Sequence, residues 1–179
     1  MKGPGEELFT ELRAHFAEFP IVVEDLGDID EPARDLVRAV GAPGMRVLSF
    51  AFNADADSEH LPIHYDPNVV CYTGTHDTNT LLGWWNDADD ITRDHVRRFL
   101  GIDGHDVVWD LIRVAMSSVA NWAVIPMQDL LALDGQARMN VPGTVTGNWS
   151  WRLPEQEPAA SVAHRLRDLI DLYGRSVPR

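Results

Sequence analysis

The stretch VVCYTGTHD, residues 69–77, decides the fold class, because a short apolar run ends here in a turn followed by two titratable side chains. An apolar run of this length with a glycine beyond it predicts a strand that is buried on both faces, as in a parallel sheet. A charged side chain can stay hydrated only where such a strand ends. His76 and Asp77 are therefore expected at the edge of the sheet where barrel enzymes keep their chemistry.

A second stretch of the same kind, PIVVEDLG at residues 20–27, places Glu24 after another apolar run. Because the carboxyl ends of parallel strands meet at one edge, Glu24 and Asp77 are predicted to share a pocket. The pattern alone leaves two interpretations: a glycosidase-like pair of carboxylates, or caps of the helices that follow, which is the commoner role of such acids. His76 can donate a hydrogen bond to a sugar hydroxyl or tune its neighbour.

Helical and strand patterns alternate along the chain. Helices are predicted at 6–19, 31–40, from 78 onward, at 91–100, 105–122 and 157–173, with a helical turn at 127–133, and strands are predicted from residue 21 and at 45–52, 69–72 and 123–126. This order indicates an α/β fold with about four parallel βα units in one domain, 1–179. A closed eight-stranded barrel typically needs about 250 residues, so the pattern predicts an incomplete one.

Composition excludes several classes of partner. The formal net charge is -13, with 28 Asp and Glu against 15 Lys and Arg, so phosphate backbones would be repelled and nucleic acid is not expected. No apolar run approaches the roughly 18 residues of a membrane span, and the first residues do not read as a signal peptide. The single cysteine, Cys71, lies inside an apolar run and is predicted to be a buried, inert thiol in a cytoplasmic protein.

An acidic cluster resembles a metal site but does not fit one. It comprises Asp55, Asp57, Glu59 and His60, and His64 follows four residues after His60. The central glycine and distal glutamate of a calcium loop are not correctly placed, and Pro62 between the two histidines disfavours a helical zinc face. The sequence therefore predicts no metal and no cofactor.

A glycine-rich and tryptophan-rich segment spans residues 135–152. It combines amide, guanidinium and indole groups, among them Arg138, Asn140, Asn148 and Trp149. Carbohydrate sites use this mixture, because hydroxyls need directional partners while the apolar face of a sugar stacks on aromatic rings. A surface loop pinned by two buried tryptophans is the alternative.

Several of these motifs together resemble one family. VVEDLG (22–27), GAPGM (41–45), YTGTHD (72–77), PMQDLL (126–131) and NVPGT (140–144) with Asn148-Trp149 are similar to the C-terminal half of the 4-α-glucanotransferases, the amylomaltases or disproportionating enzymes of the α-amylase-like barrel group. The resemblance implies the C-terminal portion of a (β/α)8 TIM-type barrel. It also implies retaining transfer of an α-1,4-glucan segment to the 4-hydroxyl of an acceptor glucan or glucose, without a cofactor.

The resemblance also implies roles for individual residues. Glu24 matches the general acid/base, Asp77 the aspartate that stabilises the transition state, and His76 a histidine that hydrogen-bonds the donor sugar. Asn140 and Trp149 fall in family motifs and are expected to contact substrate.

The nucleophile that the resemblance implies is an aspartate in an Arg-x-Asp-His motif, and the 179 residues contain no such motif. Arg93-Asp94-His95 lacks the intervening residue and lies in a helical pattern. We therefore expect a fragment that is inactive alone and is completed by a missing N-terminal half of the barrel. Two alternatives are a sugar-binding or partner-completing half-barrel without catalysis, and an independent α/β domain whose acids only cap helices.

Overall fold

The computed structural model describes residues 3–16, 20–52, 56–155 and 158–176. Its sheet has three parallel strands in the order β1-β2-β3: β1 (Gly44–Val47), β2 (Val69–Tyr72) and β3 (Trp122–Val124). Gly44 pairs with Val69, and Tyr72 pairs with Val124. The strand predicted at 69–72 is confirmed and lies in the middle of the sheet.

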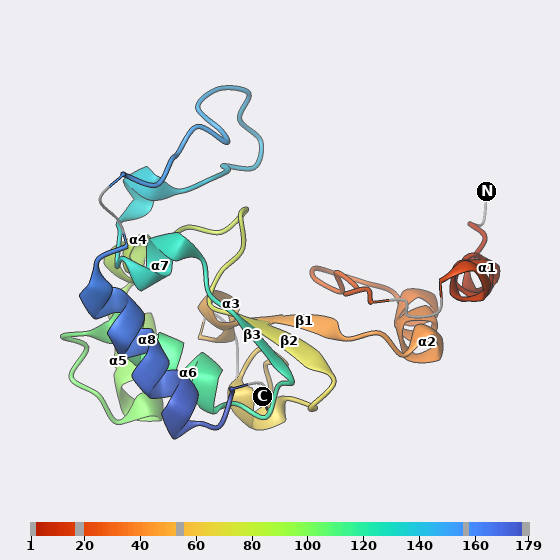
Figure 1. Ribbon diagram of the computed structural model, residues 1–179, viewed down its shortest axis with the longest axis horizontal. Helices are drawn as coiled ribbons and strands as arrows, with labels where there is room; N and C mark the ends of the chain where they lie inside the picture. The colour runs from red at the N-terminus through yellow and green to blue at the C-terminus, as the bar shows by residue number, and fades with distance from the viewer. Residues whose placement is uncertain (1–2, 17–19, 53–55, 156–157, 177–179) are drawn as a thin grey trace.

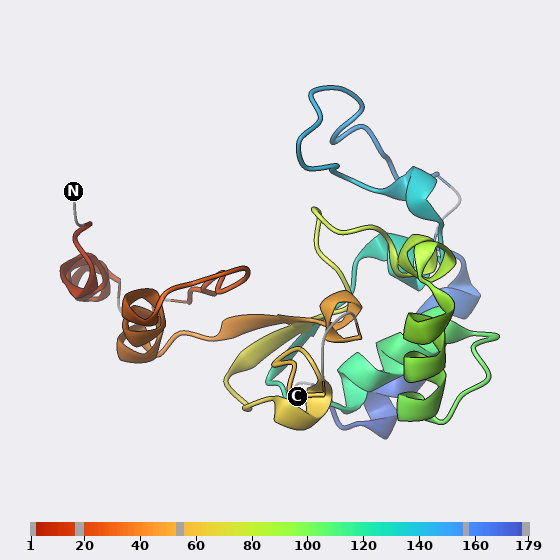
Figure 2. The ribbon, with the colours of Figure 1, turned by 180° about the vertical axis from the view of Figure 1, so that it is seen from behind.

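Helices gather on one side of the strands in both views (Figures 1 and 2). They are α3 (Leu48–Ala51), α4 (Leu81–Asp87), α5 (Asp90–Leu100), α6 (Val107–Ser117), α7 (Met127–Leu130) and α8 (Ala160–Leu172), with 3-10 turns η1 (Pro62–His64) and η2 (Gly135–Ala137). The helices predicted at 31–40 and 91–100 are confirmed by α2 (Glu31–Val40) and α5.

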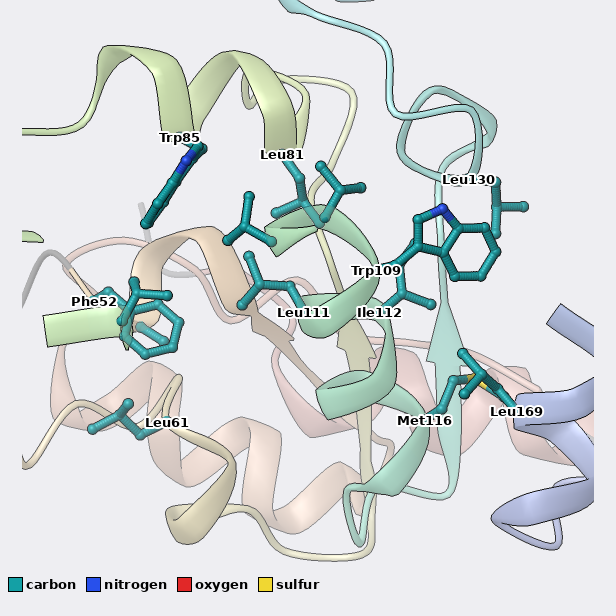
Figure 3. Packing of buried hydrophobic residues seen from close by; sticks show 14 residues of the cluster. Phe52, Leu61, Leu81, Trp85, Trp109, Leu111, Ile112, Met116, Leu130 and Leu169 are labelled. Atoms are coloured by element: carbon teal, nitrogen blue, oxygen red, sulfur yellow. The ribbon is translucent and has the colours of Figure 1, made fainter. Parts of the chain in front are cut away.

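The core is built around α6 (Figure 3). Leu111 and Ile112 are fully buried on this helix, and they belong to one cluster with Leu81 of α4 and Leu169 of α8. Full burial of one such side chain stabilises the folded state by about 1.5–3 kcal/mol, so this cluster holds the helices together.

Cys71 lies at the centre of β2 and is fully buried. Burial raises the pKa of its thiol to about 11. The thiol is therefore neutral at physiological pH, as the prediction of a buried cysteine requires.

The N-terminal region projects away from this body (Figures 1 and 2). It contains α1 (Glu6–His15) and α2, which lie beside each other. Within the described part of the chain α1 buries no residue and α2 buries Val40 alone. Leu8, on the apolar stripe that predicted α1, is 46% exposed.

One strand prediction is wrong, and another is right only in part. The strand predicted from Ile21 is not formed: residues 20–26 have no regular secondary structure, so the described residues contain three strands instead of four. The strand predicted at 45–52 ends at Val47 and gives way to α3. A short apolar run fits either a buried strand or a buried helical turn, so periodicity alone does not separate them.

Three predicted helices are shorter in the structure. The helix predicted at 105–122 stops at Ser117, because Ser118 adopts an extended backbone and Trp122 already pairs with Val70 in the sheet. The helix predicted at 6–19 ends at His15, and residues 17–19 lie outside the described residues. The predicted closing helix begins at Ala160, and residue 157 likewise lies outside them.

Candidate active site

A cavity of about 880 Å³ opens beyond the carboxyl ends of the strands. It is lined by Glu24, Leu26, Gly27, Met45, Ser49, Phe50, Tyr72, Gly74, Thr75, His76, Asp77, Thr78, Asn79, Thr80, Trp84, Val124, Pro126, Gln128, Asp129, Arg138, Met139 and Pro142. The structure thus brings Glu24, His76 and Asp77 to one cavity.

The turn after β2 presents Asp77. Thr75 N donates to Thr78 Oγ1 at 2.9 Å, and Thr78 Oγ1 donates back to Thr75 O at 3.1 Å. Asp77 N donates to Thr75 Oγ1 at 3.2 Å. The hydroxyls of Thr75 and Thr78 therefore provide hydrogen-bond partners for backbone groups of this turn, as Thr side chains do in tight turns.

The carboxylate of Asp77 is half exposed and has specific partners. Asn140 Nδ2 donates to Asp77 Oδ1 at 2.7 Å, and His76 Nε2 lies 3.4 Å from the same oxygen. Arg138 Nη2 donates to the backbone oxygen of Asp77 at 2.5 Å. The carboxylate is oriented by its neighbours and still open to water on one side.

The loop after η2 reaches back to the same turn. Asn140 N donates to His76 O at 3.0 Å, and the rings of His76 and Trp149 lie 5.2 Å apart at an interplanar angle of 34°. In Figure 1 this loop and the turn after β2 rise on the same side of the sheet. Of the residues that the sequence predicted for the site, Asn140 therefore hydrogen-bonds Asp77, and Trp149 packs beside His76.

The alternative of a surface loop pinned by two buried tryptophans does not fit. Trp149 is 53% exposed and Trp151 is only partly buried. Trp149 also has a positive φ of 59°, a conformation that is uncommon for a residue other than glycine and is concentrated at functional sites. An exposed indole beside an imidazole offers a surface on which a sugar ring can stack.

Neither predicted carboxylate caps a helix. The cap of α2 is Asp30, whose carboxylate accepts from Ala33 N at 3.0 Å. The cap of α4 is Thr80, whose hydroxyl accepts from Gly83 N at 3.1 Å. The capping interpretation of Glu24 and Asp77 is therefore wrong for this structure.

Sequence reasoning missed Asp129 as a site residue. Its carboxylate lines the cavity, is 1% exposed, and accepts from Thr73 Oγ1 at 2.6 Å and from Leu81 N at 2.8 Å. Burial raises the pKa of this carboxyl above its ordinary value, while the two hydrogen bonds lower it. The signal was present in the sequence, because Asp129 follows the apolar run of β3 much as Asp77 follows that of β2.

Among the described residues no group of three His, Cys, Asp or Glu side chains could hold a metal ion. Within the acidic cluster noted in the sequence, Glu59 pairs with Arg46 at 3.2 Å and His60 Nδ1 accepts from Val47 N at 3.2 Å. Asp55 lies outside the described residues. In the same described part of the chain, no helix has the length and apolar character to cross a membrane.

Parallel strands with an acidic cavity at their carboxyl ends place the chain among α/β proteins with the layout of barrel enzymes. A family model described as 4-alpha-glucanotransferase matches residues 1–157. The chain belongs to this family.

Named relatives agree with this assignment. The chain is 44% identical over 177 residues to the chloroplastic/amyloplastic 4-alpha-glucanotransferase DPE1 of Arabidopsis thaliana, covering 97% of this chain and 31% of the relative. It is 41% identical over 183 residues to the 4-alpha-glucanotransferase of Thermus thermophilus, covering 98% and 37%. The chain therefore spans about a third of the length of these relatives.

Solved structures match in the same way. The amylomaltase from Streptococcus agalactiae, solved in complex with acarbose, superposes with a TM-score of 0.93 at 30% identity, covering 99% of this chain and 36% of that one. The amylomaltase from Corynebacterium glutamicum gives a TM-score of 0.59 at 14% identity over 83% of this chain and 28% of that one, a likeness of fold alone. A partial barrel agrees with the open three-stranded sheet.

Proposed function

We propose that these 179 residues carry part of the active site of a 4-α-glucanotransferase, with Glu24 as general acid/base and Asp77 as the carboxylate that stabilises the transition state. The reaction is retaining transfer of an α-1,4-glucan segment to the 4-hydroxyl of another glucan or of glucose. The observation that carries the proposal is that Glu24 and Asp77 line one cavity together with His76.

The chemistry assigns a distinct task to each group. A retaining enzyme needs one protonated carboxyl for the leaving oxygen and one ionised carboxylate that attacks carbon. Glu24 is proposed for the first task, since it lines the cavity in which a bound glucan would place its leaving oxygen. Asp77, oriented by Asn140, is suited to stabilising the positive charge that develops on the ring.

Sugar recognition is proposed for the remaining predicted residues. His76 and Trp149 offer adjacent rings, one with a polar edge and one with a broad apolar face. Asn140, which donates to Asp77, has an amide oxygen that can accept from a sugar hydroxyl. α-1,4-Linked maltodextrins, the breakdown products of starch and glycogen, are the substrates that this combination would take.

The attacking carboxylate is proposed to come from an N-terminal half of the barrel. No Arg-x-Asp-His motif occurs in the sequence, and β3 lies at an edge of the sheet that the described residues form, with Trp122 65% and Val124 42% exposed. An exposed strand edge of this kind pairs readily with a further strand.

A cytoplasmic location is also part of the proposal, and the relatives include chloroplastic/amyloplastic and bacterial proteins.

Activity assays test the proposal. The 179-residue chain alone is expected to release no glucose from maltotriose. The fusion enzyme, in which this chain follows the part of the Streptococcus agalactiae amylomaltase that precedes its matching segment, is expected to release glucose. Glu24→Gln should reduce that release by about 10²–10⁴-fold, the usual contribution of general acid–base catalysis. The exposed Glu6→Gln serves as the control and should keep full activity.

Disproportionation by the chain alone, or an active Glu24→Gln fusion enzyme, would contradict the proposal. A sugar-binding module without catalysis is the second candidate, favoured by the exposed Trp149 beside His76. It predicts that the chain alone binds acarbose in a calorimetric titration, that Trp149→Ala removes this binding, and that the fusion enzyme stays inactive.

A further inference from the structure

The segment that carries Glu24 has no secondary structure to hold it. Residues 20–26 belong to neither helix nor strand, and they precede α2 in the region that projects from the body. One backbone hydrogen bond, from Val23 N to Pro43 O at 2.9 Å, ties this segment to the chain just before β1. General acid catalysis needs the carboxyl within hydrogen-bond reach of the leaving oxygen, so a loosely held segment is a poor carrier for it.

The next residue, Asp25, is anchored firmly to β1. Its carboxylate accepts from Met45 N at 2.6 Å and pairs with Arg46 Nη1 at 3.0 Å. The side chains of Asp25 and Arg46 are only 10% and 16% exposed. A partly buried ion pair with an added backbone donor is stronger and better oriented than a surface pair.

Arg46 is itself held from two other directions. It donates to Met45 O at 2.6 Å, and its Nη2 lies 3.2 Å from Glu59 Oε2. These two contacts fix the guanidinium independently of Asp25. The fixed guanidinium in turn limits the positions that the Asp25 carboxylate can take.

Gly44 leaves the space that Asp25 occupies. A Cβ atom at residue 44 would lie 2.3 Å from Asp25 Oδ2 and 2.8 Å from its Cγ. Real Cβ atoms do not come this close, so any larger residue at 44 must displace the carboxylate. The close approach between Gly44 and Asp25 sets the distance between the segment and β1.

Side chains on either side of Asp25 face the cavity. Glu24 and Leu26 both line it, while Asp25 between them reaches β1. We propose that Asp25 is a positioning residue, which uses Met45, Arg46 and the space at Gly44 to fix the carboxyl of Glu24 in the cavity. This inference rests on the proposed role of Glu24 as acid/base.

The fusion enzyme tests the inference through two substrates that differ in their need for an acid. Maltotriose needs a proton at its leaving oxygen, whereas the fluoride of α-maltosyl fluoride leaves without one. Asp25→Asn, nearly isosteric, and Gly44→Ala, which acts from the other side of the contact, are expected to lower kcat on maltotriose by about 10²-fold, the scale of a 1 Å misplacement. First-turnover fluoride release should stay within about two-fold of the wild-type rate, because it bypasses the acid. Asp28→Asn, an exposed acid in the same region, is the matched control.

A double variant separates positioning from general stability. In the Glu24→Gln background Asp25→Asn should cause no further loss, since two residues that act through one group are not additive. A further loss in that background, an equal loss on both substrates, or unfolding of both Asp25→Asn and Gly44→Ala by circular dichroism would overturn the inference while leaving the proposed function intact. Full maltotriose transfer by Glu24→Gln alone would instead overturn the proposed function, and the inference with it.

Discussion

The side-chain amide of Asn140 donates a 2.7 Å hydrogen bond to Oδ1 of Asp77, across 63 positions of sequence. This contact joins the turn after β2 to the loop after η2, so the proposed stabilising carboxylate is oriented by a residue from a distant segment. A directional donor of this kind leaves the second carboxylate oxygen free for a substrate.

Asn140→Ala should therefore lower transfer activity of the fusion enzyme without unfolding it. Loss of one oriented polar group in a catalytic site typically costs about 10²-fold in kcat. Steady-state kinetics with maltotriose measures the loss, and Asn86→Ala, at an exposed position on α4, is the control. An unchanged kcat in Asn140→Ala would show that Asp77 does not depend on this hydrogen bond.

Thr80 and Asp77 are expected to separate stability from activity. Thr80 caps α4, so Thr80→Ala should lower the free energy of unfolding by about 0.5–2 kcal/mol. Asp77→Asn should change that free energy by less than about 0.5 kcal/mol, as surface substitutions do, yet abolish transfer in the fusion enzyme. Urea unfolding of the 179-residue chain and kinetics of the fusion enzyme give the two values. The reverse ranking would mean that Asp77 contributes more to stability than to transfer.

Asp129 is predicted to matter for stability through its hydrogen bonds more than through its charge. Asp129→Ala leaves Leu81 N without its acceptor inside the protein and should cost about 1–3 kcal/mol. Asp129→Asn should cost less, because its amide oxygen still accepts from Leu81 N while its nitrogen donates to the Thr73 hydroxyl. Urea unfolding measures both, with the exposed Asp57→Ala as control. Equal costs for the two variants would mean that the charge itself is required.

His60 should make stability depend on pH. Burial lowers the pKa of His60 below its ordinary value of 6.5, and its neutral Nδ1 accepts from Val47 N. Between the folded and unfolded pKa values the unfolded chain binds more protons, so this contribution is complete above about pH 6.5 and is lost as the pH falls towards the folded pKa. Raising the pH above this range adds no further stability from His60.

His60→Asn keeps an acceptor near Nδ1 but does not titrate in this range. The free energy of unfolding of the variant should therefore fall less than that of the wild type between about pH 7.5 and pH 5.5. Urea titrations at the two pH values measure the difference, and His105→Asn, at an exposed histidine, should retain the wild-type slope. A wild-type slope in His60→Asn would assign the pH dependence to other groups.

Much of the fold was predictable from local patterns. The apolar run at 69–72 predicted β2, and Asp30, Pro32 and Gly41 are the start and stop signals that bound α2 as the structure shows it. The run from Ile21 misled, because a strand exists only where a neighbour supplies its hydrogen bonds. Among the described residues, one backbone hydrogen bond, from Val23 N to Pro43 O, joins this run to another segment. Whether a neighbouring strand pairs with the run depends on tertiary structure and cannot be predicted from the residues of the run alone.

The site was predictable in kind but not in its connections. Acids after apolar runs indicated Glu24 and Asp77 as residues of one pocket. The sequence did not indicate that Asn140 would bond Asp77 or that Trp149 would lie beside His76, because both contacts depend on how a long loop folds back. Asp129 lies in α7, where the sequence predicted a helical turn, but that turn does not reveal that the carboxylate is buried against Thr73 and Leu81.

The strands lie across the sheet in the same order in which they occur along the chain. A ribosome therefore delivers β1, β2 and β3 in the sequence in which each can add to the one before it, and no strand has to be inserted between two that have already paired. Chains fold from the N-terminal side during synthesis, so β2 can align on β1 while α6 is still being made. Until β3 emerges, the outer edge of β2 is open, and this interval is when the nascent chain is most exposed to pairing with another copy.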